Sequence, residues 1–181
     1  MRLKPRDVTV SAVFSVLTAI GAWISIPLPI TPVPFTLQVF FVLLSGAVLG
    51  GRLGALAQTI YLLLGLIGLP VFAGGGSGPG VLVGPTGGYL LGFVVAAYLT
   101  GKISEGKRFS CLIRMILGTL SGLVAIYLLG EIGLWMWLRS TLSVLLMFGV
   151  IPFLPADVIK ALMAAYIASR RQMRQLLQKQ N

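Results

Sequence analysis

No Asp, Glu, Lys or Arg interrupts the stretch Leu53-GALAQTIYLLLGLIGLPVFAGGGSGPGVLVGPTGGYLLGFVVAAYLT-Gly101. A domain that faces water carries charge on about a quarter of its residues, so a surface of this length without any charge does not suit an aqueous solvent. Over all 181 residues the charged fraction is only 10%, whereas 57% of the residues are hydrophobic. The stretch therefore predicts a protein that lies in lipid.

The scarcity of reactive side chains excludes several classes of chemistry. The chain has no His, and Cys111 is its only cysteine, so metal clusters, disulfide frameworks and His-based catalytic triads are ruled out. Its acidic residues are Asp7, Glu105, Glu131 and Asp157. The sequence also lacks a phosphate-binding loop and a pair of intramembrane aspartates. We therefore expect no enzyme, no resident metal and no resident cofactor.

Uncharged stretches on both sides of this segment predict an all-α membrane protein with six transmembrane helices. The predicted helices are Val8–Ile26, Phe35–Gly51, Leu53–Leu69, Gly87–Gly101, Met115–Gly130 and Pro155–Ser169. The intervening segment Ser140–Leu154 is also apolar but is short and rich in Pro at its end. We interpret it as a re-entrant or interfacial lid, with Trp135 and Trp137 anchoring its start at the membrane interface.

The basic residues indicate how the helices are oriented. With six spans, Lys160 lies inside a span and Arg139 is the single basic residue on one side, while all the other Lys and Arg residues fall on the opposite side. The positive-inside rule then places both termini in the cytoplasm. We interpret the net charge of +10 as this topology signal and not as a nucleic-acid surface.

This topology predicts a single membrane domain over residues 1–181. A basic cytoplasmic N-terminus covers 1–7, a six-helix bundle covers 8–169, and a basic cytoplasmic tail covers 170–181. The first apolar run follows a basic start as a signal peptide does, but it is long for one, and we expect it to be retained as the first span.

The three outer connections of this topology are Pro27–Pro34, Leu69–Thr86 and Glu131–Pro155, and all are nearly uncharged. Non-helical backbone at membrane depth is tolerated where it is buried in protein or lines a cavity. We therefore expect these connections to fold back over a ligand cavity. For the Gly-rich segment Gly74–Gly80, a flexible linker is the equally weighted alternative.

Asp157 and Lys160 are the most informative polar residues of the sequence. At a spacing of i to i+3 they share one face of the last helix, one turn from its outer end. Charges inside a membrane cost several kcal/mol unless they pair or face water, and they commonly mark a functional site. We predict a polar floor for a neutral group that offers both N–H donors and a carbonyl, as a cyclic urea does. An ion pair that only holds the helix is the structural alternative.

Other candidate ligand-binding residues lie near the ends of the predicted helices. Thr86 is a candidate N-cap of the fourth helix, and Gly87 and Gly88 next to Tyr89 leave backbone N–H groups available to an anion. Ordinary capping with close helix packing explains the same residues equally well. Gln38, within an apolar helix, either lines the cavity or bonds across helices.

Four motifs in order resemble the BioY family of biotin transporters, which are substrate-binding S components of energy-coupling factor (ECF) transporters. The motifs are Pro32-VPFTL-Gln38, Gly68-LPVFA-Gly74, Gly84-PTGGYLLG-Phe93 and Pro155-ADVI-Lys160. The resemblance implies a six-helix S-component fold that captures biotin at its outer side. Import would then need a transmembrane coupling subunit and two ATPase subunits. ATP would bind to the ATPase subunits and not to this chain.

The resemblance also implies roles for particular residues. Asp157 and Lys160 would contact the ureido ring of biotin. The chain has no basic residue between Arg52 and Lys102, so the valerate carboxylate would bind backbone N–H groups near Gly74–Ser77 or Thr86–Gly88, with help from Tyr89. S components present small residues on the first helix to the coupling subunit. That role would fall to the stripe formed by Ser11, Ser15 and Ala19.

Two further function classes follow from the same polar pair. A solitary or ion-coupled porter would use Asp157 and Lys160 as a proton or gating pair and would transport without ATPases. A lipid-modifying enzyme would use Lys160 as a base, but the missing His and second acid argue against it.

Overall fold

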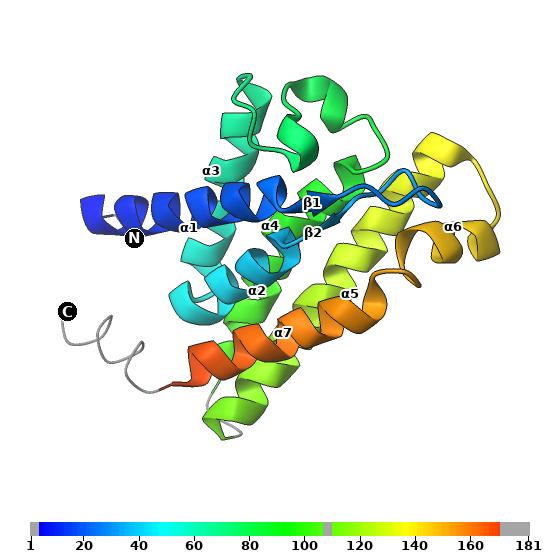
Figure 1. The fold of residues 1–181 in the computed structure, drawn as a ribbon. Helices are drawn as coiled ribbons and strands as arrows, with labels where there is room; N and C mark the ends of the chain where they lie inside the picture. The colour runs from blue at the N-terminus through cyan, green and yellow to red at the C-terminus, as the bar shows by residue number, and fades with distance from the viewer. Residues whose placement is uncertain (1–3, 107–109, 171–181) are drawn as a thin grey trace.

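The computed structural model describes residues 4–106 and 110–170 and is mainly helical (Figure 1). Its helices are α1 (Pro5–Trp23), α2 (Gln38–Leu49), α3 (Gly51–Leu66), α4 (Gly87–Ser104), α5 (Cys111–Leu138), α6 (Leu142–Gly149) and α7 (Leu154–Ser169). The short strands β1 (Ser25–Ile26) and β2 (Phe35–Thr36) pair antiparallel, and two single 3-10 turns, Ala73–Gly75 and Pro79–Val81, follow α3. Met1–Leu3, Lys107, Arg108 and most of the predicted tail, 171–181, lie outside the described residues.

Each of the six predicted helices is present as a helix, and the fifth is longer than predicted. The prediction that a loop starts at Glu131 was wrong, because α5 continues to Leu138. No Pro interrupts this extension, and the Glu131 carboxylate accepts a hydrogen bond from the Tyr89 hydroxyl of α4, so the acid is accommodated within the helix. Trp135 and Trp137 consequently lie at the end of α5. The rest of the connection forms α6, which meets α7 at an angle of 53°.

The helices differ in how well their lengths match a bilayer. Among the described residues, α5 alone is long and apolar enough to cross a membrane by itself, with 28 residues and a mean hydropathy of 2.0. The bent pair of α6 and α7 meets the same test together. Helices α2 and α3 are apolar but have only 12 and 16 residues. At 1.5 Å per residue they reach only about 18 Å and about 24 Å.

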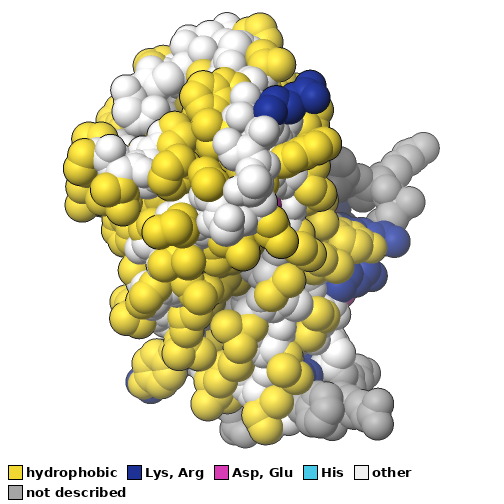
Figure 2. Space-filling model, turned by 90° about the vertical axis from the view of Figure 1, so that its right-hand side faces the viewer, with side chains coloured by type: hydrophobic (Ala, Val, Ile, Leu, Met, Phe, Trp, Pro, Cys, Tyr) yellow, Lys and Arg dark blue, Asp and Glu magenta, His cyan; other side chains and the backbone are white. Residues whose placement is uncertain are grey.

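The outer surface of the bundle is apolar. Large hydrophobic side chains are exposed on several helices, among them Val16 of α1, Leu128 of α5 and Tyr166 of α7. Figure 2 shows hydrophobic side chains over most of one face, with Lys and Arg at a few places near its margin. A contiguous apolar surface of this extent suits lipid and not water.

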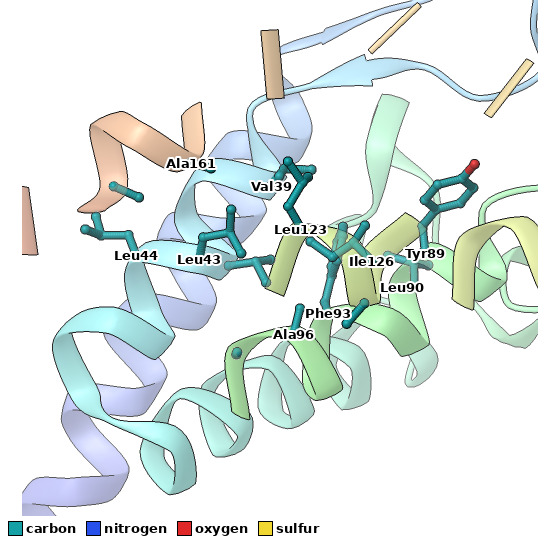
Figure 3. Packing of buried hydrophobic residues seen from close by; sticks show 14 of the residues in the cluster. Val39, Leu43, Leu44, Tyr89, Leu90, Phe93, Ala96, Leu123, Ile126 and Ala161 are labelled. Atoms are coloured by element: carbon teal, nitrogen blue, oxygen red, sulfur yellow. The ribbon is translucent and has the colours of Figure 1, made fainter. Parts of the chain in front are cut away.

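The core lies where α2, α4 and α5 meet. In Figure 3, Val39 and Leu43 of α2 point toward Phe93 of α4 and toward Leu123 and Ile126 of α5. Close backbone contact between α4 and α5 depends on glycine. A Cβ atom at Gly88 would overlap the Leu129 carbonyl and would come within 2.9 Å of the Gly133 Cα. The two helices therefore form a closely packed wall.

The outer connections are fastened to this bundle by hydrogen bonds. The Tyr61 hydroxyl of α3 donates to the Val71 carbonyl at 3.0 Å, and the Gly78 N–H donates to the Gly65 carbonyl at 2.8 Å. The Gly-rich connection is therefore folded against α3 and is not a free linker. On the other side, the Thr31 hydroxyl donates to the Phe148 carbonyl at 2.7 Å and joins the first connection to α6.

Candidate functional site

A cavity of about 340 Å³ is lined by residues of α2, α4, α5 and α7 and of the connections before α2, α4 and α7. Its volume falls within the range of about 300–1,000 Å³ that is common for small-molecule sites. Apolar side chains make up much of the wall, including Val39, Phe72, Phe93, Ile126 and Phe153. The polar side chains of the wall are Thr36, Gln38, Thr86, Tyr89, Tyr127 and Asp157. Such a wall suits a ligand with a compact polar head and an apolar body.

Asp157 contributes a carboxylate to the cavity from the first turn of α7. Its side chain is nearly buried, and both of its oxygens are bonded. Oδ1 accepts from the Lys160 ammonium at 2.7 Å, and Oδ2 accepts from the Tyr127 hydroxyl at 2.9 Å. The predicted pairing of Asp157 with Lys160 on one helix face is confirmed, and the carboxylate is fixed in position before any ligand arrives.

Lys160 lies behind Asp157 and does not form part of the cavity wall. Its ammonium donates to Asp157 and to the Thr36 carbonyl at 2.6 Å, and it lies 3.9 Å from the centroid of the Phe35 ring. The ring face and the carbonyl both stabilise the cation. The arrangement orients Asp157 and balances its charge.

Tyr127 is a cavity residue that the sequence did not single out. It occupies an ordinary position in the apolar helix α5, and its bond to Asp157 joins residues that are 30 positions apart. The spacing of residues within one helix does not predict a contact between two helices. A single Tyr in a long apolar helix indicates only weakly that its hydroxyl has a hydrogen-bond partner.

A second polar cluster joins α4, α5 and α6 and consists of Tyr89, Glu131 and Gly149. The Tyr89 hydroxyl lies 2.9 Å from Oε1 of Glu131 and 3.0 Å from the Gly149 carbonyl oxygen. Oε2 of Glu131 is buried and has no hydrogen-bond partner in the described part of the chain. Sequence reasoning did not single out Glu131, which bonds to the cavity residue Tyr89 but is not part of the cavity wall, because the predicted loop starts at this position.

The remaining candidate ligand-binding residues are distributed unevenly. Gln38 reaches the cavity wall, but its amide is bonded to Thr36 and to Tyr61. Thr86 lines the cavity at the N-cap position of α4 without a side-chain capping bond. Gly87 and Gly88 do not line the cavity, and Gly88 serves the close packing against α5 that was the stated alternative. Ser77 is exposed, away from the cavity wall.

The small-residue stripe on α1 faces α3 along much of its length. Ser11 and Ser15 are buried and donate to the Leu53 and Ala57 carbonyls of α3. Ala19 is partly buried. The exposed side of α1 instead carries larger residues such as Val13 and Val16.

Known proteins resemble this chain over nearly its whole length. The model of the BioY family matches residues 1–178. A probable biotin transporter BioY of Pyrococcus horikoshii is 45% identical over 173 residues, which cover 94% of this chain and 98% of that protein. The biotin transporter BioY of Thermotoga maritima is 46% identical over 168 residues, with coverage of 91% and 95%.

A solved structure shares the fold described above. It is the crystal structure of the S-component for biotin from an ECF-type ABC transporter, with a TM-score of 0.81 and 28% sequence identity. The match covers 94% of this chain and 95% of that chain. The helical architecture, the family model and the curated relatives agree, and the chain belongs to the BioY family.

Proposed function

We propose that this protein captures biotin at the outer side of the cell membrane for import by an ECF module. The observation that carries the proposal is the fixed Asp157 carboxylate on the wall of an otherwise mainly apolar cavity. The ureido ring of biotin offers two N–H donors, which a carboxylate accepts well. Its sulfur-containing ring and hydrocarbon chain suit the apolar wall.

The proposed topology has α1, α2, α3, α4, α5 and α7 as six spans with both termini in the cytoplasm. Residues 1–7 and 170–181 are the cytoplasmic ends of the single domain, and residues 8–169 form the bundle. The outer connections cap the cavity. This topology is supported by the charge asymmetry of the sequence and by the apolar exterior of the bundle.

Import is proposed to require a transmembrane coupling subunit and ATPase subunits. A dissociation constant near 1 nM corresponds to about 12 kcal/mol, so release on a transport timescale needs work from a partner. Docking through α1 would use the exposed side of that helix. The Ser11 and Ser15 hydroxyls are bonded to α3 and would hold α1 in place.

Calorimetric titration of biotin into the detergent-purified protein tests the binding function. We expect one-to-one binding, and we expect Asp157→Asn to weaken it by about a hundredfold, because a charged acceptor is lost from a buried site. Asp7→Asn is the matched control, since Asp7 lies in the first turn of α1 at the opposite end of the bundle. Absence of biotin binding by the folded wild type would refute the proposal.

A porter that acts alone remains the alternative, because Asp157 and Lys160 form a buried ion pair that could also serve proton coupling. Proteoliposomes that contain this protein alone distinguish the two functions. Capture for an ECF module predicts binding without concentrative uptake. Fast uptake driven by an ion gradient would favour the porter.

A further inference from the structure

Tyr61 of α3 is fully buried and does not line the cavity, but it contacts two parts of the cavity wall from behind. Its hydroxyl accepts from Nε2 of Gln38 at 2.6 Å and donates to the Val71 carbonyl at 3.0 Å. Its ring meets the Phe72 ring edge to face, with the two centroids 5.6 Å apart. Gln38 and Phe72 both line the cavity, so Tyr61 supports a polar and an apolar residue of the wall.

The hydrogen bonds around Tyr61 determine how the Gln38 amide is oriented. A tyrosine hydroxyl has one proton, and the Val71 carbonyl, which is only an acceptor, takes it. The lone pairs of the hydroxyl must then face a donor, so Gln38 turns its NH2 group toward Tyr61. The Thr36 hydroxyl fits the same orientation, because it donates to Oε1 of Gln38 at 3.1 Å. The reverse orientation would place two acceptors opposite each other at Tyr61.

This orientation leaves one donor of Gln38 available. The NH2 group has two N–H bonds, and one of them is used by Tyr61. The other has no acceptor within residues 4–106 and 110–170, and Gln38 lies on the cavity wall. Gln38 therefore provides a donor whose direction is fixed before a ligand binds.

The donor of Gln38 is linked to the acceptor that Asp157 supplies. Lys160 donates to Asp157 and to the Thr36 carbonyl. The Thr36 hydroxyl donates in turn to Gln38. One chain of hydrogen bonds therefore joins the two cavity residues. A cyclic urea has an N–H donor on each side of its carbonyl oxygen, so a wall with a carboxylate and an amide N–H complements such a ring.

We propose that Tyr61 is a positioning residue for the ligand and directs the second N–H of Gln38 to the ureido carbonyl oxygen of biotin. This inference rests on the proposed function and deepens it. Loss of the Tyr61 hydroxyl frees the Gln38 amide to rotate and leaves the Val71 carbonyl without this donor. Recognition of the ureido oxygen therefore depends on a residue that does not touch the ligand.

Three ligands isolate the bond to the ureido oxygen. Biotin is compared with 2-thiobiotin, in which sulfur replaces this oxygen and accepts hydrogen bonds only weakly. Dethiobiotin keeps the ureido ring and lacks the sulfur of the other ring, so it is the control ligand. Competition titration on the purified full chain gives the three affinities. The preference for biotin over 2-thiobiotin then reports the hydrogen bond to the ureido oxygen.

Tyr61→Phe removes the hydroxyl and keeps the ring. We expect it to weaken biotin binding by about threefold to tenfold and to lower the preference for biotin over 2-thiobiotin by about threefold. The preference over dethiobiotin should change by less than about twofold. Tyr98→Phe is the matched control, because Tyr98 of α4 is exposed and its hydroxyl makes no hydrogen bond within the described residues. Weaker binding of all three ligands with unchanged preferences would show a merely structural role and overturn the inference.

A double-mutant cycle tests whether Tyr61 acts through Gln38. Gln38→Leu removes the amide, and we expect it to lower the preference for biotin over 2-thiobiotin at least as much as Tyr61→Phe does. In the Gln38→Leu background, Tyr61→Phe should change this preference no further, because residues that act through one contact are not additive. Additive effects of the two substitutions on the preference would overturn the assignment.

Gln38→Glu keeps the test decisive if Tyr61→Phe does not fold. It preserves the shape of the side chain and the oxygen that accepts from Thr36, but it removes the N–H donor. We expect the preference for biotin over 2-thiobiotin to fall by about tenfold or more, because an acceptor then faces the ureido oxygen. An unchanged preference overturns the inference while leaving biotin capture intact. Failure of the folded wild type to bind any of the three ligands overturns the proposed function itself.

Discussion

Asp157 and Glu131 lie near the same cavity, but the chain stabilises them in different ways. Both oxygens of Asp157 accept hydrogen bonds, and a buried ammonium balances its charge. Glu131 uses one oxygen for Tyr89, and its other oxygen has no partner in the described residues. The comparison shows two ways to bury an acid. Both carboxylate oxygens can have partners, as in Asp157, or one oxygen can lack a hydrogen-bond partner among the described residues, as in Glu131. Loss of the cation should therefore destabilise the Asp157 cluster most, whereas loss of a single tyrosine hydroxyl should cost more in the Glu131 cluster.

The largest effect is expected from Lys160→Met, which removes the charge balance of Asp157. Removing the cation from a buried carboxylate lowers the free energy of unfolding by about 3–5 kcal/mol. The double variant Asp157→Asn/Lys160→Met should recover much of this loss, because no uncompensated charge remains. Thermal unfolding in detergent measures both. A double variant as unstable as the single one would show that Lys160 contributes packing and not charge balance.

A smaller effect is expected from Gly149→Ala, which perturbs the Glu131 cluster sterically. A Cβ atom at this position would overlap Oε1 of Glu131 and the Tyr89 hydroxyl, so either these side chains give up their hydrogen bond or α6 shifts. We expect a loss of about 1–3 kcal/mol, seen as a lower unfolding temperature. Gly80→Ala is the control, because a Cβ atom at Gly80 would point into open space, with no atom beyond its chain neighbours within 4 Å. Equal effects of the two substitutions would contradict the tight packing of α6.

The same substitution in each cluster compares them directly. Tyr89→Phe removes the donor to Oε1 of Glu131 and to the Gly149 carbonyl, so we expect a stability loss of about 1–3 kcal/mol. Tyr127→Phe should cost only about 0.5–1.5 kcal/mol, because Asp157 keeps Lys160. Chemical unfolding of the two variants measures the difference, and the reverse order would disprove the contrast between the clusters.

The smallest effect is expected from Thr31→Val, which removes the bond from the first connection to the Phe148 carbonyl. A single exchanged hydrogen bond contributes about 0.5–1.5 kcal/mol. We expect little change in global stability and faster hydrogen exchange near residues 31–33. Unchanged exchange at these residues would mean that the hydroxyl does not hold the connection.

Sequence periodicity predicted the helices well, because each rests on local hydropathy. It also predicted the Asp157 and Lys160 pair, whose spacing is a local property of one helix. The end of α5 was misplaced since Glu131 looked like a loop residue, whereas no Pro ends the helix there and the Glu131 carboxylate bonds to Tyr89, 42 positions away.

Contacts between helices account for the features that the sequence did not reveal. Ser11 and Ser15 share one face by spacing, but spacing does not identify the neighbour of that face, and the structure shows it to be α3. Tyr127 was missed for the same reason, because its partner lies on another helix. Which helix face meets which neighbour depends on the packing of the whole bundle.

The shortness of α2 determines how deep a ligand can lie. The helix is largely covered by its neighbours, and its first two residues, Gln38 and Val39, lie at the cavity wall. A bilayer core is about 30 Å thick and α2 reaches about 18 Å, so α2 as a span of the proposed topology is about 12 Å short. Because surrounding helices shield α2 from lipid, this shortfall causes no hydrophobic mismatch. In the proposed topology it leaves room for the cavity at the start of α2, and one additional turn there would fill that space with protein.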